Sequence, residues 1–173
     1  LQLMILLATA FVLGQEIKYN TSPRLMRMAD GSIVKALFGK LFPQTVVWWV
    51  IAIFMLAWLY RFNHYPMNGQ WWVMVLNELM YVVAAQCFAV AVFGLLPNLR
   101  LSLSVCALTG ILTFSIAAYS FPVQSMYGGM AIFSYLMPAR YNFLIYANTA
   151  LNGLPFHYSL IWFACYLAYP LLA

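Results

Sequence analysis

The acidic and histidine side chains of this 173-residue sequence are few and lie far apart. The acids are Glu16, Asp30 and Glu78, and the histidines are His64 and His157. General acid–base and metal chemistry need such groups in pairs or clusters, and no His-Glu-x-x-His motif occurs. We therefore expect no catalytic residue, no metal site and no enzymatic activity in this chain.

No motif in the sequence would hold a cofactor. Cys87, Cys106 and Cys165 stand singly in apolar runs, which predicts buried small side chains and not a disulfide or metal framework. Gly39-Lys40 lacks the upstream glycine and the following Ser or Thr of a phosphate-binding loop. Any ATP and magnesium would therefore be bound by a partner chain.

Glu78 is the one acid inside a long apolar run. If a helix begins near Trp71 and rises about 1.5 Å per residue, Glu78 lies about 10 Å below the outer end. A carboxylate at that depth marks a functional or a paired position. Three interpretations stay open: it lines a transport pathway, it pairs with Arg61 or Arg140, or it is a protonated acid hydrogen-bonded in the bundle.

The composition predicts the elements that must position these residues. Hydrophobic residues make up 66% of the chain and charged residues 6%, against about 25% charged in soluble domains. The net charge of +5 does not indicate a nucleic-acid partner, because five of the eight basic residues fall between residues 15 and 42. We predict an all-α polytopic membrane protein, with residues 1–173 forming a single transmembrane domain in contact with membrane lipid.

Five apolar runs are candidate membrane spans, judged against the roughly 20 residues that a crossing needs. The sequence starts and ends within apolar runs, without an initiator Met. We interpret it as a fragment, so the first span is expected to be truncated. The spans are predicted at about 1–14, 43–60, 71–96, 101–121 and 156–173.

The basic residues predict the orientation, because Lys and Arg are retained on the cytoplasmic side. The connection over 15–42 and the turn at Arg100 carry six of the eight, whereas Arg61 and Arg140 lie on the other side. Aromatic residues flank the predicted outer loop, as in an interfacial aromatic belt: Trp58, Tyr60, Tyr65, Trp71 and Trp72.

The inner connection, residues 15–42, is predicted to contain two helices. Ser22-Pro23 is a helix start and Asp30-Gly31 a stop, so residues 22–30 are predicted to form a short basic helix projecting into the cytoplasm. A second start at Ser32 precedes an amphipathic helix along the membrane surface. The connection could be a surface anchor on anionic lipid or a lever that docks on a cytoplasmic partner.

The outer segment, residues 122–155, is too long and apolar for a solvated loop. Gly128-Gly129 and Pro138 divide it, and its halves, 130–137 and 140–151, are too short to cross. We predict two short re-entrant helices in the outer leaflet.

Several short motifs occur in a fixed order along the chain. They are Glu16-x-Lys18-x-x-Thr21 with Asn20 where Gly is usual, Gly31-Ser32, Gly39-Lys40-x-x-Pro43, Ser120-Phe121-Pro122-x-x-x-Met126, and Leu136-Met137-Pro138-Ala139-Arg140-Tyr141. In order and spacing the chain resembles the membrane permease of the type-2 ABC exporters over essentially its whole length.

The resemblance implies an export function. The family has six spans, of which this chain would supply the second to the sixth, and its inner connection holds a coupling helix that sits in a cleft of an ABC ATPase subunit. A second permease half, identical or different, and in one branch a periplasmic adaptor, complete such exporters in the bacterial cytoplasmic (inner) membrane. The residues implied are Glu16, Lys18, Thr21, Arg24, Arg27 and Asp30 for coupling, with the helix itself at roughly 21–30, and Pro122, Met126, Pro138 and Arg140 for the outer gate.

Two other functions stay open. An ion-gradient-driven secondary transporter would use Glu78 as its coupling carboxylate. A membrane-embedded lipid-modifying enzyme would need an acid or histidine cluster, which this sequence lacks.

Overall fold

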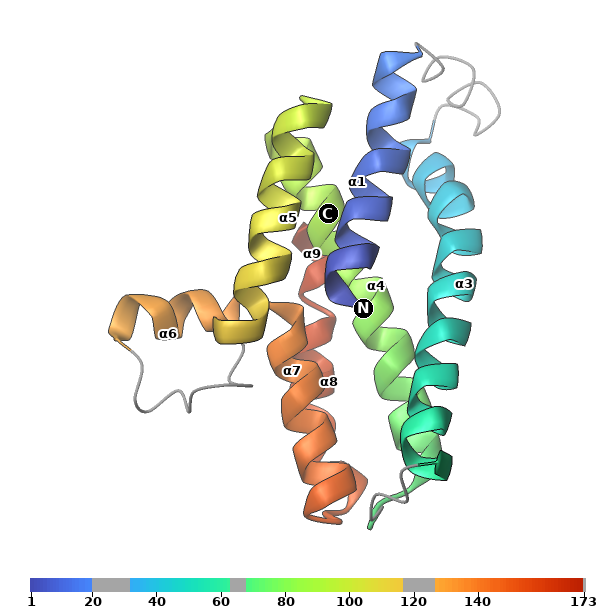
Figure 1. The fold of residues 1–173 in the computed structure, drawn as a ribbon, viewed down its shortest axis with the longest axis vertical. Coiled ribbons are helices and arrows are strands. Elements are labelled where there is room, and N and C mark those ends of the chain that lie inside the picture. The colour runs from blue at the N-terminus through green and yellow to red at the C-terminus, as the bar shows by residue number, and fades with distance from the viewer. Residues whose placement is uncertain (20–31, 63–67, 117–126, 173) are drawn as a thin grey trace.

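The computed structural model describes residues 1–19, 32–62, 68–116 and 127–172. All the regular elements in these ranges are helices, which confirms the all-α prediction. In Figure 1, α1, α3, α4 and α5 run along the long axis, α6 projects sideways, and α7 and α8 form a hairpin at the lower end. The elements are α1 (Gln2–Lys18), α3 (Ile33–Phe62), α4 (Trp71–Leu95), α5 (Leu99–Ile116), α6 (Gly128–Tyr135), α7 (Pro138–Tyr146), the π-helix η2 (Ala147–Leu151), α8 (Phe156–Tyr166) and α9 (Tyr169–Leu172).

Three of the described helices are long and apolar enough to cross a membrane: α3, α4 and α5, with 30, 25 and 18 residues. They carry large exposed apolar side chains such as Phe54, Ile111 and Phe114. Exposing such apolar side chains to water is unfavourable, whereas exposing them to lipid is favourable. These helices support a membrane protein, although fewer crossings are found than the five predicted.

The last predicted span, 156–173, is not one helix. α8 ends at Tyr166, and the amides of Leu167 and Ala168 bond to carbonyls three residues back, at 3.1 and 3.2 Å. Pro170 follows and has no N–H to continue an α-helical ladder. The predicted span over 156–173 therefore consists of two helices separated by a turn, which the apolar sequence did not indicate.

The predicted boundary between a surface helix ending at residue 42 and a span starting at 43 is also wrong. α3 runs without interruption from Ile33 to Phe62 and contains Pro43. A proline removes one backbone hydrogen bond and bends a helix. The helix can still continue through it when the turns on both sides keep their hydrogen bonds. At about 1.5 Å per residue α3 is about 45 Å long, so its first turns, which carry Lys35 and Lys40, extend beyond about 30 Å of hydrocarbon.

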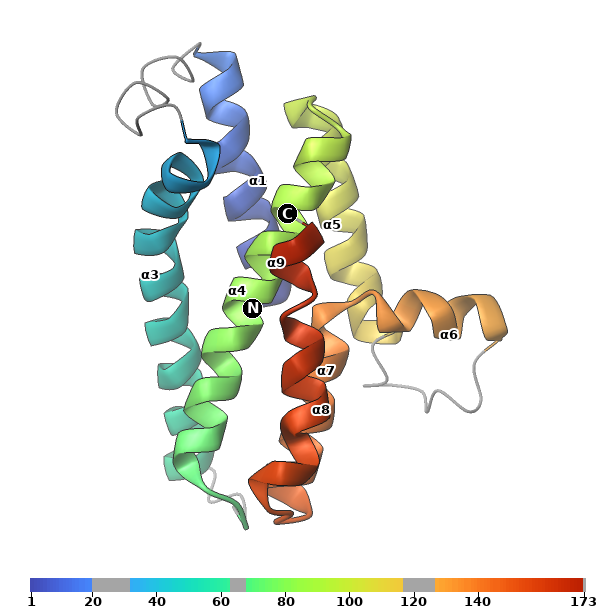
Figure 2. The same ribbon diagram turned by 180° about the vertical axis from the view of Figure 1, so that it is seen from behind.

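α4 is the central helix of the bundle. It contacts α1, α3, α5, α7, α8 and α9, and Figure 2 shows it crossing between α3 and the α8–α9 segment. Its buried face holds Ala84, Ala85 and Ala89, and such small side chains let neighbouring membrane helices approach closely. Residues on α4 are therefore well placed to connect separate parts of the molecule.

Candidate functional site

The structure describes only part of the predicted sites. Glu16 and Lys18 lie at the end of α1, and Pro138 and Arg140 lie in the first turn of α7. The other predicted positions fall outside the described residues: Thr21, Arg24, Arg27, Asp30, Pro122 and Met126.

At the predicted inner end, α1 and α3 are held together by Lys40. Its Nζ forms an ion pair with the Glu16 carboxylate and donates a hydrogen bond of 2.7 Å to the Val12 carbonyl. One turn further along α3, Gln44 donates to the Thr9 hydroxyl at 3.2 Å. These contacts, which we call the inner clamp, join two motifs that lie 24 residues apart in the sequence.

At the other predicted site, Arg140 is only 6% exposed. Its Nη1 donates to the Ser134 hydroxyl at 2.8 Å, and its guanidinium carbon lies 3.9 Å from the centroid of the Tyr135 ring. Pro138 occupies the start of α7, where a missing N–H is tolerated. The two residues therefore fix the corner between α6 and α7.

Within the described part of the chain, no Lys or Arg lies within ion-pair distance of Glu78, and the positive group that acts on its carboxyl group is the amino group of Leu1. Among the described residues, which include Arg61 and Arg140, the only ion pair is the Glu16–Lys40 pair of the inner clamp. The predicted alternative of a structural pair with either arginine is therefore wrong. Glu78 instead lines a cavity of about 410 Å³, which we call the Glu78 cavity.

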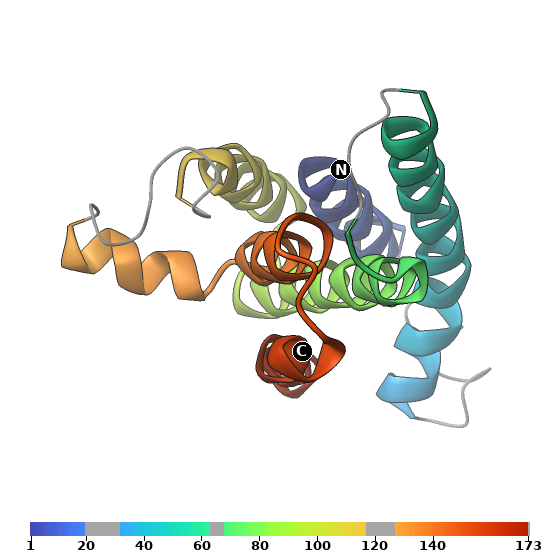
Figure 3. The same cartoon turned by 90° about the horizontal axis from the view of Figure 1, so that it is seen from below.

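The residues that line the Glu78 cavity belong to α3, α4, α7 and the start of the chain at Leu1. Figure 3 shows the arrangement of these helices from below. One part of its wall is apolar, with Ala52, Met55, Leu56 and Leu59 from α3 and Leu1 from the chain start. The other part carries one carboxyl, one amide and three phenol groups: Glu78, Asn142, Tyr60, Tyr81 and Tyr146. Its volume lies within the range of about 300–1,000 Å³ typical of ligand pockets.

Hydrogen bonds position the polar wall of the cavity. The Asn142 amide lies beside the Glu78 carboxyl group, and its Oδ1 accepts a bond of 2.9 Å from Asn77 Nδ2. Asn77 in turn accepts a long bond of 3.5 Å from the Tyr166 hydroxyl. These contacts link α4 to α7 and α8.

Tyr60 adds a polar atom without a bonding partner. Its side chain is 8% exposed, and its hydroxyl lies beside Tyr146 but makes no hydrogen bond of normal geometry. A buried unsatisfied hydroxyl is unfavourable by about 1–3 kcal/mol.

Other polar side chains within the bundle connect helices. The Thr45 hydroxyl donates to Gln86 Oε1 at 2.6 Å. The Tyr81 hydroxyl donates to Gln2 at 3.3 Å, and Gln2 donates to the Thr113 hydroxyl at 3.2 Å. These bonds match the helix-joining role of polar groups in membrane proteins.

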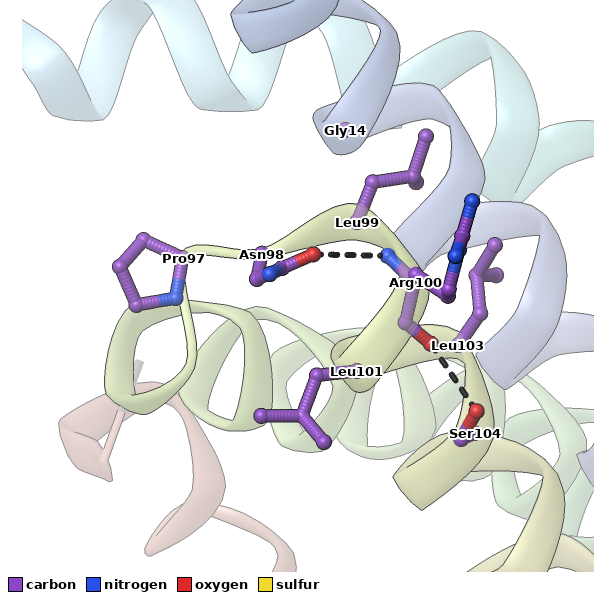
Figure 4. Close-up of a pocket in the computed structure, with 8 residues that line it drawn as sticks. All are labelled: Gly14, Pro97, Asn98, Leu99, Arg100, Leu101, Leu103 and Ser104. Carbon is purple, nitrogen blue, oxygen red and sulfur yellow. Dashed lines mark hydrogen bonds between the residues drawn. The ribbon is translucent and has the colours of Figure 1, made fainter.

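A second hollow, of about 990 Å³, lies at the turn between α4 and α5 (Figure 4). Its polar groups are engaged in the turn itself. Asn98 Oδ1 accepts from the Arg100 amide at 3.2 Å, and the Ser104 hydroxyl donates to the Arg100 carbonyl at 3.0 Å. Leu99 fills the space beside Gly14 (Figure 4). Only the Arg100 side chain offers charge there, so the Glu78 cavity is the better candidate site.

The sequence indicated Glu78 as a candidate, and it did not predict which residues would lie around it. Asn142 and Tyr146 were assigned to the outer segment, and Tyr60 follows Trp58 in the predicted aromatic belt. Their meeting at Glu78 depends on how α7 packs on α4, for which the sequence held no signal.

The chain matches no family model, no curated protein and no solved structure.

Proposed function

We propose that this chain is the transmembrane permease subunit of a type-2 ABC exporter. It moves a substrate across the bacterial inner membrane by alternating access, and a separate ABC ATPase subunit supplies the energy. ATP and magnesium are bound by that subunit. A second permease half completes the pathway.

The inner clamp is the observation that carries this proposal. A connection that transmits movement has to be held firmly where it leaves and where it enters the bilayer. The Glu16–Lys40 pair and the Lys40–Val12 bond join α1 to α3 on either side of residues 20–31. Displacement of that segment by a partner would therefore act on both helices together, and two states that bind the partner differently can then do work.

The test is charge reversal in the proposed coupling helix. The tagged full chain is purified with its bound ATPase, and hydrolysis is compared for Arg24→Glu, Arg27→Glu and Lys35→Glu. We expect Arg24→Glu and Arg27→Glu to abolish stimulated hydrolysis, because they remove the positive charge that docks on the partner. Lys35→Glu is the matched control. Lys35 is exposed on α3 and lies outside the proposed coupling helix, so this variant should keep the stimulated hydrolysis.

The proposal is contradicted if no ATPase purifies with the chain. It is also contradicted if both charge-reversal variants still show stimulated hydrolysis. Variants count only when they elute as folded species at the position of the unmodified chain.

The Glu78 cavity favours one further candidate, an ion-gradient-driven transporter. A carboxyl group inside a bundle, with no Lys or Arg paired to it among the described residues, is the kind of group that binds and releases a coupling ion. Transport that continues after ATP depletion, stops with an ionophore and is lost in Glu78→Gln would favour this candidate. Transport that stops with ATP depletion alone favours the exporter.

A further inference from the structure

We propose that the hollow at the turn between α4 and α5 binds an anionic phospholipid, with the lipid phosphate on the Arg100 guanidinium and an acyl chain along the exposed face of α5. This is the hollow of about 990 Å³ that Figure 4 shows, and we call it the Arg100 hollow. The inference stands apart from the proposed exporter function, because it requires only that α4 and α5 lie in a membrane.

The Arg100 hollow lies where two membrane helices meet at their ends. α4 ends at Leu95 and α5 begins at Leu99, and both helices are long and apolar enough to cross a bilayer. The ends of such helices lie near the lipid headgroups, since the hydrocarbon is about 30 Å thick. The third contribution to the hollow is Gly14 of α1. Gly14 lies about 20 Å along α1 from Leu1, so the chain start does not border the hollow.

Arg100 supplies the charge. It is exposed, and no Asp or Glu among the described residues lies within ion-pair distance of it. The turn engages only its backbone, because the amide donates to Asn98 Oδ1 and the carbonyl accepts from the Ser104 hydroxyl. A guanidinium group binds phosphate oxygens through two parallel hydrogen bonds. The Arg100 side chain is therefore suited to an anionic headgroup.

The apolar lining of the hollow favours a lipid over a free phosphate ion. A small hydrated anion gains nothing from apolar side chains, whereas a lipid buries its apolar parts against them. The volume of about 990 Å³ is near the upper end of the range of about 300–1,000 Å³ for ligand pockets. The apolar lining residues are Pro97, Leu99, Leu101 and Leu103.

One face of α5 continues the apolar lining toward the membrane interior. Ser104, Leu108 and Ile111 follow Arg100 at spacings of four, four and three residues, which places them on one side of the helix. Leu108 and Ile111 are 58% and 65% exposed. Thr113, which accepts a hydrogen bond from α1, lies on the other side. From Arg100 to Ile111 this face is about 16 Å long, which is about the depth of one leaflet.

Phosphatidylglycerol is a suitable probe, because it carries one phosphate and a net negative charge. Phosphatidylcholine with the same acyl chains is the comparison, since its ammonium group compensates for the phosphate. Binding of each lipid to the detergent-solubilised full chain is measured by native mass spectrometry. We expect phosphatidylglycerol to bind more tightly. Inorganic phosphate in large excess should not displace it, because phosphate has no acyl chain.

Three variants assign the binding to the hollow, and all three of the replaced side chains are exposed, so the variants should fold. Arg100→Gln should lower the affinity for phosphatidylglycerol by about fivefold and leave that for phosphatidylcholine unchanged. Ile111→Ser should lower the affinity for both lipids by about threefold. Arg61→Gln is the matched control at the end of α3, and it should change neither affinity.

The proposal is overturned if phosphatidylglycerol binds no more tightly than phosphatidylcholine, or if inorganic phosphate displaces it. It is also overturned if Arg100→Gln lowers the affinity for phosphatidylglycerol no more than Arg61→Gln does. A second copy of the chain on the same face of α5 would give another result. Ile111→Ser would then shift the folded chain to a smaller species in size-exclusion chromatography and leave lipid binding unchanged, which would equally overturn the proposal.

Discussion

At the scale of single residues, the two described acids of this chain have different surroundings. Glu16 lies at the end of α1 and forms an ion pair with Lys40, whereas Glu78 lines a cavity and has no Lys or Arg within ion-pair distance among the described residues. A carboxylate that is already paired serves to hold structure, and one that lacks a partner is open to a ligand. The sequence identified Glu78 by its place in an apolar run. It did not predict the Glu16–Lys40 pair, because the pair depends on how α1 and α3 meet.

The inner clamp gives the prediction at this scale. Lys40→Glu places two acids together and removes the donor to the Val12 carbonyl, so the free energy of unfolding should fall by about 1–3 kcal/mol. Adding Glu16→Lys restores an ion pair of reversed polarity but not the bond to Val12, so the double variant should recover only part of the loss. Thermal unfolding in detergent measures both. A double variant no more stable than Lys40→Glu alone would show that the pair does not hold the helices.

Among the helices, hydropathy located the apolar segments correctly. It was less accurate for the residues at which a helix begins or is interrupted. The start of α4 at Trp71 and the turn around Asn98 follow directly from the sequence. The apolar run at 156–173 concealed the break at Leu167 and Ala168, because hydropathy does not register the missing N–H of Pro170. Pro43 led to the opposite error. It suggested a helix boundary at a position where α3 is continuous. Whether a proline ends a helix or bends it depends on packing that hydropathy does not contain.

Close packing of α1 on α5 is a feature that only the structure reveals. A Cβ atom added at Gly110 would lie 2.6 Å from Leu3 Cδ1 and 3.1 Å from Leu3 Cα, whereas nothing lies within 4 Å of one added at Gly94. The first glycine therefore allows two helices to touch, and the second has no such role.

These glycines give the prediction at this scale. Gly110→Ala should separate α1 from α5 and lower the free energy of unfolding by about 1–3 kcal/mol. Gly94→Ala is the matched control and should leave stability unchanged or raise it by up to about 1 kcal/mol, because alanine favours helix. Equal unfolding temperatures for the two variants would contradict the packing of α1 on α5.

At the scale of the whole molecule, the described helices form a bundle around α4 whose two ends have different chemistry. One end holds the inner clamp and Arg100, and the other carries aromatic contacts such as Trp58 with Phe62 and Trp72 with Phe156, whose ring centroids lie 4.3 and 5.2 Å apart. The difference between the two ends was predictable. The basic residues cluster in the predicted inner connections, and the aromatic residues cluster around the predicted outer loop. The number of crossings was not predictable, since α1 is apolar yet shorter than a full span, and the last apolar run is divided between α8 and α9.

The proposed exporter requires the connection between α1 and α3 to lie at the cytoplasmic face, where an ATPase can reach it. Site-directed labelling tests it most directly, with Cys87, Cys106 and Cys165 replaced by Ala and one cysteine introduced at Arg24 or at Asn152. Asn152 is exposed in the turn before α8, at the opposite end of the bundle, and serves as the matched position. We predict that a membrane-impermeant maleimide labels Asn152→Cys in sealed cells with a permeable outer membrane, and labels Arg24→Cys only after the inner membrane is opened. Labelling of Arg24→Cys in the sealed cells would place this connection on the outer face and would contradict the proposed docking of an ATPase.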